Sequence, residues 1–241
     1  MIAPRLSLVI PCYNEQGNLP RLVERCRQVF VGKGVEVVLV NNGSTDSTAS
    51  LLSELIGDCE FIRSVRVDVN QGYGFGVLSG LRAARGEFLA WTHADLQTDP
   101  ADVMRGIALI EGARVPQRAF VKGKRHGRRL GDLVFTWGMA VLETMLLGYA
   151  LWDINAQPNV FHRSFFDAWV DPPHDFSLDL YVYVTALRSG LEIRRFPVYF
   201  SPRLEGQGHN DQLAAKLRYT RRTLSFSLNL RRRLRSTAER G

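Results

Sequence analysis

The chain has little cysteine and no metal-binding cysteine pattern. Its 241 residues include three cysteines, Cys12, Cys26 and Cys59, whose spacing differs from that of a zinc site. Three cysteines cannot all pair with one another, so a fold built on disulfides is excluded. A reduced, cytosolic setting is the simplest expectation.

Low-complexity tracts and a recognisable leader are also absent. The first residues, MIAPRLSLVIPCYNE, lack the charged and long apolar regions of a signal peptide and lead directly into an expected strand. A composition of 45% apolar and 23% charged residues is that of a folded protein. A chain of 241 residues can bury one substantial core and is too short for two comfortable ones.

Positive charge is in excess and is concentrated in two clusters. The formal net charge is +7. One cluster is KGKRHGRR at residues 122–129; the other runs from Lys216 to Arg235, where eight Lys or Arg residues occur with no acidic residue. Such clusters suit the phosphates of nucleic acids, anionic lipids or small molecules, although a solvated basic surface has the same composition.

The first half of the chain alternates between strand and helix patterns. Short β-rich runs are separated by segments of helical spacing that begin at capping residues. The expected strands are residues 6–10, 35–40, 61–67, 87–91 and 120–122, and the expected helices are residues 18–30, 46–56 and 73–85, with another helix opening at 99–100. This alternation predicts an α/β fold with a mostly parallel central sheet and helices on both faces.

The second half is less regular. Residues 133–152 form an apolar run with one charge, Glu143, which is borderline in length for a membrane span. The mid-run charge and two glycines favour instead a helix that is buried against the sheet or lies at a membrane surface. Further expected elements are a strand at 159–162, a helix at 178–188 and a strand at 192–200.

The C-terminal residues have the composition of a basic amphipathic helix. Over residues 211–235, leucines and other apolar residues are interleaved with arginines. Such a helix either lies at a membrane interface or docks on the core, and the sequence leaves both open. We therefore expect an α/β domain over residues 1–210 and a basic amphipathic helical tail over residues 211–241.

The most informative stretch is GEFLAWTHADLQTDP at residues 86–100. An apolar strand leads directly to His93, Asp95 and Gln97. Open α/β sheets bind their ligands at the carboxyl ends of the strands. An imidazole, a carboxylate and an amide at this edge suit a divalent cation with a bound diphosphate.

Two earlier loops carry polar side chains to the same edge. After the first strand, PCYNE at residues 11–15 offers Tyr13 for stacking on a base and Glu15 for accepting hydrogen bonds. After the second strand comes NNGSTD at residues 41–46, where Asn41 and Asn42 can read a nucleobase edge. The same residues also make a good turn followed by a helix cap.

A glycine-rich turn, NQGYGFG at residues 70–76, opens the third helix. Glycines allow close backbone approach, and a helix N-terminus favours anions. The G-x-G-x-x-G pattern of dinucleotide-binding folds is missing from the first strand–helix loop, which disfavours a dehydrogenase.

These four motifs, in this order, resemble those of the GT-A glycosyltransferases of family 2, most closely the dolichyl-phosphate mannose synthase-like, polyprenyl-phosphate branch. There the motifs read PxYNE, DDGSxD, NxGxGxA and DADLQ. The resemblance covers residues 5–130 and extends less securely through DINAQP at 153–158 to residue 206. It implies a GT-A fold and inverting transfer of a hexose from a UDP- or GDP-sugar.

The resemblance also implies the roles of individual residues. Asp95 is the direct ligand of Mg²⁺ or Mn²⁺, with Gln97 and His93 beside it. Arg203 grips the donor diphosphate. The implied nucleotide-sugar site comprises Pro11, Tyr13, Glu15, Asn41, Asn42, Asp46, Gly72 and Arg203.

The chain departs from the family pattern in places that bear on the donor. His93 stands where the family has an acid, which weakens the metal site, biases it toward Mn²⁺ or leaves the metal held chiefly by Asp95. Asn41 and Asn42 replace aspartates, which leaves the base open between uridine and guanosine. Gly208 and His209 replace the Ser-Lys pair of the family, so a phosphate contact is lost or replaced.

The resemblance implies that the acceptor is a polyprenyl phosphate or a lipid-linked saccharide. For a sugar hydroxyl, Asp179 is the candidate general base, although a capping or buried aspartate has the same sequence pattern. A phosphate acceptor is already ionised and needs no base. Its expected clamp is Lys124, Arg125, Arg128 and Arg129.

These expectations describe a cytoplasmic enzyme of cell-envelope glycan synthesis, peripheral at an anionic membrane surface. The second hypothesis is a catalytically inactive sugar-nucleotide-binding assembly partner, which the loss of the acid at His93 motivates. Nucleic-acid binding is disfavoured because the basic residues lie beside apolar helical runs and not on aromatic platforms.

Overall fold

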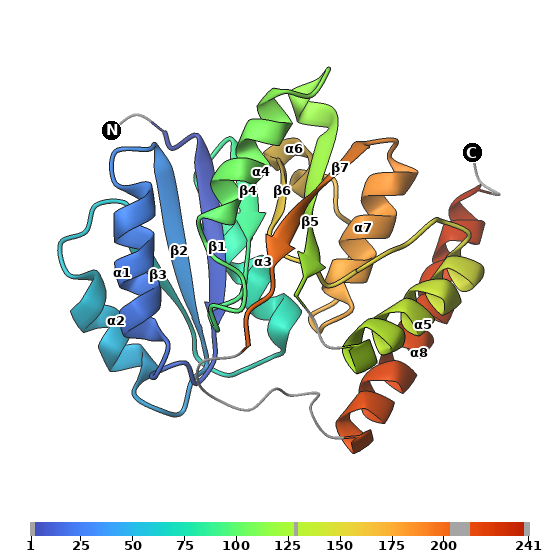
Figure 1. The fold of residues 1–241 in the computed structure, drawn as a ribbon, viewed down its shortest axis with the longest axis horizontal. Helices are drawn as coiled ribbons and strands as arrows, with labels where there is room; N and C mark the ends of the chain where they lie inside the picture. Colours follow the sequence, from blue (N-terminus) through green and yellow to red (C-terminus); the bar gives the residue numbers. More distant parts are fainter. Residues whose placement is uncertain (1–2, 128–129, 203–212, 239–241) are drawn as a thin grey trace.

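The computed structural model describes residues 3–127, 130–202 and 213–238. Its centre is a seven-stranded sheet in the order β3-β2-β1-β4-β6-β5-β7 (Figure 1). The strands are β1 (Leu6–Cys12), β2 (Val35–Asn42), β3 (Ile62–Val67), β4 (Phe88–Trp91), β5 (Ala119–His126), β6 (Asn159–His162) and β7 (Glu192–Tyr199). The helices are α1 (Leu19–Phe30), α2 (Thr48–Ile56), α3 (Tyr73–Ala83), α4 (Asp102–Glu111), α5 (Leu130–Leu147), α6 (Arg163–Asp167), α7 (Leu178–Arg188) and α8 (Leu213–Ala238), with a 3₁₀ turn η1 (Pro116–Arg118).

The sheet is mostly parallel, as predicted. Strands β3, β2, β1 and β4 run in one direction, and β5 pairs in parallel with β7. Strand β6 is antiparallel to both β4 and β5. The carboxyl ends of β1, β2 and β4 therefore meet at one edge of the sheet, where the loops after them lie together (Figure 1).

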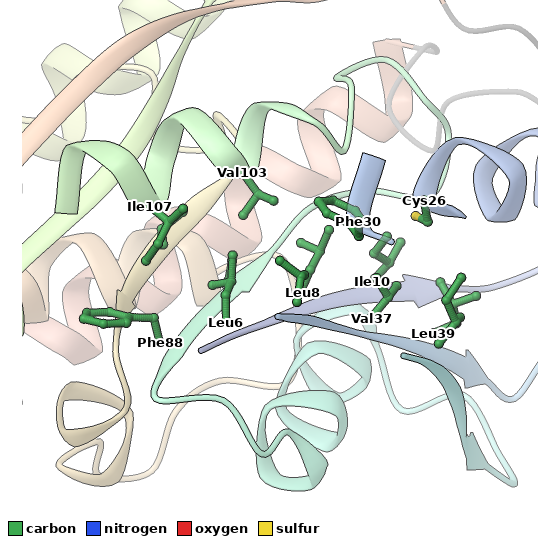
Figure 2. Packing of buried hydrophobic residues seen from close by; sticks show 14 of the residues in the cluster. Leu6, Leu8, Ile10, Cys26, Phe30, Val37, Leu39, Phe88, Val103 and Ile107 are labelled. Atoms are coloured by element: carbon green, nitrogen blue, oxygen red, sulfur yellow. The ribbon is translucent and has the colours of Figure 1, made fainter. Parts of the chain in front are cut away.

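Two apolar layers cover the two faces of the sheet. Along β1, Leu6, Leu8 and Ile10 pack toward α1 and α4, as Figure 2 shows, with Phe30 and Val103 opposite them. Val9 belongs to the other layer, which contains residues of α3 and α7. Alternate strand residues point to opposite faces, so a strand buried on both sides is apolar almost without interruption.

The apolar run at residues 133–152 packs mainly along α8. Of the two alternatives for it, burial against the sheet holds only at its end, where Leu147 and Leu151 join the second apolar layer. Helix α5 ends at Leu147 and packs along α8, at the end of the molecule away from α1 and α2 (Figure 1). Glu143 is buried in this contact and accepts a hydrogen bond from Ser227 Oγ at 2.5 Å. The single charge of the run therefore joins the two helices.

The outer face of α5 leaves large apolar side chains exposed. They are Leu133, Val134, Trp137, Val141 and Met145, with 37–69% of each accessible. Within the described part of the chain, no helix has the length and apolarity needed to cross a membrane.

Residues 213–238 of the predicted tail form α8, which packs on α5 with Ser227 buried against Glu143, and the role of this helix as a basic amphipathic tail stays a prediction. The proposed boundary between residues 210 and 211 lies outside the described residues, so the division into two domains stays a prediction.

Candidate functional site

The loop that follows β4 carries the predicted metal ligands on a closed turn. Thr92 N donates to Val9 O at 3.1 Å, and the buried hydroxyls of Thr92 and Thr98 lie 3.1 Å apart. Between them, Leu96 has a φ of +54°, a conformation that is uncommon for a leucine. Strained backbone of this kind is concentrated at ligand sites, because the surrounding structure has to hold it in place.

Asp95 and Gln97 lie at the tip of this loop and are partly exposed. Gln97 N donates to Asp95 Oδ1 at 3.2 Å. The Gln97 side chain donates to Ser201 O at 3.2 Å, and Ser201 N donates back to Gln97 O at 2.8 Å. The end of β7 is thus fastened to the loop, two residues before Arg203, which itself lies outside the described residues.

His93 lies on the inner side of the same loop. Its ring centroid is 5.5 Å from that of Tyr73, the first residue of α3. Burial raises the pKa of Tyr73, and the charges of Asp179 and Asp95 raise it further. Tyr73 therefore lies near both the predicted metal ligand and the predicted base, with the His93 ring against it.

The side chains of this loop suit a divalent cation whose coordination shell is completed by other ligands. Among the described residues, no group of three or more His, Cys, Asp or Glu side chains could hold a metal ion. Mg²⁺ is commonly bound by one or two carboxylates together with substrate phosphates and water. Asp95, with the amide oxygen of Gln97, matches that mode, and whether His93 coordinates the metal stays a prediction.

The PCYNE and NNGSTD loops are joined by a hydrogen-bond network. Asn14, at a φ of +55°, accepts from Thr45 N at 2.8 Å and donates through its own N–H to Ser44 Oγ at 3.1 Å. Asp46 accepts from Thr48 N at 2.9 Å and from Gln16 N at 3.3 Å. Asp46 therefore ties the first residue of α2 to the PCYNE loop, and Tyr13 is partly exposed beside this network.

Asn41 and Asn42 are buried and have structural partners. Asn41 Oδ1 accepts from Ser44 N at 3.1 Å, which closes the turn. Asn42 Nδ2 donates to Gly72 O at 3.0 Å and so ties β2 to the start of α3. The motif therefore forms the turn that was one of its two expected roles. Its other expected role, contact with a nucleobase, stays a prediction.

The glycines of the third motif allow one chain segment to approach another. A Cβ at Gly72, whose φ is +111°, would lie 2.5 Å from His174 O. A Cβ at Gly74 would lie 2.6 Å from Pro173 O, and Phe75 N donates to His174 O at 2.9 Å. The motif therefore seats the loop before α7, and phosphate binding at Gly72 stays a prediction.

A buried polar cluster lies beneath the site. It consists of Lys122 on β5, Gln157 and Asn159 around the start of β6, and Asp179 in the first turn of α7, each no more than 2% exposed. Burial raises the pKa of Asp179, and the nearby side chains of Lys122 and His93 oppose that rise. In the sequence Lys122 belongs to the basic cluster at residues 122–129, a context that gives no sign of its burial. Gln157 lies in the DINAQP stretch, which is the sequence signal for it.

The predicted acceptor clamp is only partly described. Lys124 is exposed, whereas Arg125 forms a buried ion pair with Asp153, with 2.8 Å between Nε and Oδ1. Arg128 and Arg129 lie outside the described residues. The clamp therefore stays a prediction, and the guanidinium of Arg125 already has a carboxylate partner.

A cavity of about 690 Å³ lies next to the metal loop, between α1, α4 and the end of β7. Leu96 and Ser201 line it, together with charged residues that are largely paired, such as Arg25 with Asp99 at 2.6 Å. Of the predicted nucleotide-binding residues that the structure describes, none lines this cavity.

The sequence matches a known protein family over most of its length. The sequence model of the family described as "Glycosyl transferase family 2" matches residues 7–169. Similar curated proteins include undecaprenyl-phosphate 4-deoxy-4-formamido-L-arabinose transferases. The one from Pseudomonas paraeruginosa is 31% identical over 172 residues, or 68% of this chain and 48% of that protein. The one from Pectobacterium carotovorum is 40% identical over 105 residues, or 42% of this chain and 32% of that protein.

The chain thus spans half or less of the length of these relatives.

Solved structures agree on the fold. Glucosyl-3-phosphoglycerate synthase from Mycobacterium tuberculosis, in complex with Mn²⁺, UDP and glucosyl-3-phosphoglycerate, is 20% identical with a TM-score of 0.70, covering 94% of this chain and 80% of that one. Mannosyltransferase PcManGT from Pyrobaculum calidifontis, with GDP-Man and Mn²⁺, is 18% identical with a TM-score of 0.64, covering 87% and 60%. The fold is GT-A-like, and the chain belongs to glycosyl transferase family 2.

Proposed function

We propose that this protein transfers a sugar from a nucleoside-diphosphate sugar to a polyprenyl phosphate in cell-envelope glycan synthesis, with inversion at the anomeric carbon. The observation that carries the proposal is the strained loop after β4, which presents Asp95 and Gln97 at the carboxyl edge of the sheet. In such a transfer an acceptor oxygen attacks in line with the departing diphosphate. Negative charge builds up on that diphosphate as its bond to the sugar breaks.

The proposed cofactor is Mg²⁺ or Mn²⁺. When bound, the cation offsets the charge that develops on the leaving diphosphate. Asp95 would hold it, with Gln97 beside it, while the hydrogen bonds to Ser201 keep the Gln97 amide in place. The similar solved structures include one complex with Mn²⁺ and UDP and one with Mn²⁺ and GDP-Man, which supports the metal and leaves the base open.

A phosphate acceptor is favoured over a sugar hydroxyl. The names of the similar curated proteins specify undecaprenyl phosphate. A phosphate oxygen is ionised at neutral pH and needs no general base, whereas a hydroxyl needs one. Asp179, the predicted base, is 2% exposed, so an acceptor hydroxyl does not reach it in this structure.

The test is transfer by the purified protein. UDP- and GDP-sugars are each supplied with Mn²⁺ or Mg²⁺, and labelled sugar is followed into undecaprenyl phosphate or into a lipid-linked saccharide. We expect product with undecaprenyl phosphate, and none after the metal is removed with EDTA. The proposal is wrong if nucleotide binds tightly in calorimetry while no donor and acceptor pair gives product, the behaviour of an inactive binding partner.

We also propose that the protein docks on the membrane peripherally, at the cytoplasmic face, through α5 and α8. The exposed apolar residues of α5 lie next to α8, whose exposed Arg221 and Arg232 suit an anionic lipid surface. A lipid-phosphate acceptor requires the site to approach that surface. The occupant of this face is therefore the lipid headgroup region.

Placing charge on the apolar face of α5 should release the protein from vesicles. For the double variant Val134→Glu/Met145→Glu, we expect affinity for phosphatidylglycerol vesicles to fall about tenfold or more, because two apolar side chains no longer enter the interface. Co-sedimentation measures the change. The matched control is Val31→Glu, which alters an equally exposed valine at the end of α1. Equal binding by all three proteins would exclude α5 as the docking face.

A further inference from the structure

Lys122 is a lysine with no exposed surface at the centre of the molecule. Its Nζ donates to Ala156 O and to Asn159 Oδ1, both at 2.8 Å. Burial lowers the pKa of Lys122 to about 7, and the negative charge of Asp179 acts in the opposite direction. A buried cation is costly unless it is hydrogen-bonded and neutralised, so the position needs a reason.

A continuous set of hydrogen bonds leads from Lys122 to Asp179. Asn159 accepts from Lys122, and its Nδ2 donates to Asp179 Oδ1 at 3.2 Å and to Gln157 Oε1 at 2.7 Å. Gln157 Nε2 in turn donates to Asp179 Oδ1 at 2.8 Å. Two amides therefore connect an ammonium group to a carboxylate without direct contact between the charges.

The same set reaches the loop that carries the metal ligands. Gln157 Nε2 also lies 3.3 Å from the hydroxyl of Tyr73, which accepts from Trp91 Nε1 at 3.1 Å. The ring of Tyr73 lies between Phe176, stacked at 4.8 Å, and His93 at 5.5 Å. The cluster thus supports the residue against which His93 rests.

The two arginines near Lys122 have other partners. Arg125 binds Asp153, and Arg195 donates to the carbonyl oxygens of Gly123 and Asp153 at 3.0 and 3.1 Å. Asp179 is the carboxylate whose charge acts most strongly on Lys122. The two are therefore the charges that balance each other inside this cluster.

We propose that Lys122 is a positioning residue. By balancing the buried charge of Asp179 through Asn159, it fixes Gln157 and the first turn of α7. Gln157 and α7 in turn hold Tyr73 in place, and Tyr73 supports His93 in the loop after β4. The role rests on the transfer reaction proposed above. It differs from general-base catalysis by Asp179, because Asp179 here contacts protein amides and not the acceptor.

The experiment compares Lys122→Met, Asp179→Asn and the double variant Lys122→Met/Asp179→Asn, with Lys33→Met as control. Lys33→Met makes the same chemical change at an exposed lysine in the turn between α1 and β2. Thermal midpoints are measured by calorimetry for all proteins, and kcat and KM are measured for soluble ones with the donor and undecaprenyl phosphate. The double variant contains neither buried charge, so it can still be measured if Lys122→Met alone does not fold.

Lys122→Met leaves a buried carboxylate unbalanced, so we expect its midpoint to fall by roughly 5–10 °C. We expect kcat to fall about 10- to 100-fold with both KM values nearly unchanged, the pattern of displaced reacting groups. In the double variant we expect at least half of the lost midpoint to return, and transfer to be faster than in Lys122→Met. Lys33→Met should match the wild-type protein.

Three results would overturn the proposal. One is wild-type kcat and KM in Lys122→Met. Another is a double variant whose midpoint loss equals the sum of the two single losses, since unconnected residues act additively. The third is complete loss of transfer in Asp179→Asn at an unchanged midpoint, which a base in contact with the acceptor would give. If the wild-type protein transfers no sugar, the proposed function fails, and the midpoints alone decide whether Lys122 and Asp179 act as a unit.

Discussion

Replacing Asp95 with Asn is expected to lower the rate of sugar transfer by about 10³-fold or more. The carboxylate supplies the negative charge with which the site would hold a divalent cation, and a neutral amide binds Mg²⁺ or Mn²⁺ much more weakly. A metal ion contributes several kcal/mol of stabilisation to a charged transition state, and about 4 kcal/mol corresponds to a thousandfold change in rate. Because Asp95 is partly exposed on a loop, the variant should keep its thermal midpoint.

The measurement is kcat/KM for the donor over a titration of Mn²⁺, with protein stability followed in parallel. Asp68→Asn is the matched control, since Asp68 is 85% exposed and contacts Arg66 at the surface. Partial recovery of Asp95→Asn at high Mn²⁺ would agree with a weakened metal site. A wild-type rate at every Mn²⁺ concentration would show that Asp95 does not hold the metal.

Regular elements could be predicted from the sequence where local pattern and tertiary environment agree. The strand at residues 159–162 and the helix at residues 178–188 have the predicted bounds, and most others differ by one to three residues at an end. Strand β5 was predicted only over residues 120–122 and extends to His126. Its second half, GKRH, has no apolar alternation because its charged side chains are paired or exposed, as with Arg125.

Contacts between distant segments could not be predicted in the same way. Nothing in the short apolar strand β6 reveals that it runs antiparallel to β4, since direction depends on the path of the chain and not on the residues. Lys122 has the sequence context of a surface cation, and its burial is possible because Asn159 and Asp179 come from segments more than 30 residues away. The glycines at 72 and 74 suggested a phosphate cradle, whereas the loop at residues 173–175 occupies the space beside them.

Replacing Gly123 with Ala should be among the most destabilising single changes in this chain. A Cβ at this position in β5 would lie 2.1 Å from the backbone oxygen of Gln157, and backbone atoms cannot turn aside as a flexible side chain can. Gly123 N also donates to Pro158 O at 3.0 Å, so separating the two segments breaks a hydrogen bond. We expect a loss of about 3–4 kcal/mol of unfolding free energy, and a thermal midpoint roughly 10 °C lower.

The variant tests the site as well as the fold, because Gln157 is displaced directly. Its side chain joins Asp179 to Tyr73, so transfer should fall even in the fraction that stays folded. Gly138→Ala is the matched control, because Gly138 is a glycine of α5 with no neighbouring atom within 4 Å of the position its Cβ would take. This variant should keep or raise the thermal midpoint, since alanine favours the helix by about 1 kcal/mol over glycine. A Gly123→Ala protein that melts with the wild type would show that residues 123 and 157 are not packed as closely as described, and the positioning of Asp179 through Gln157 would fail with it.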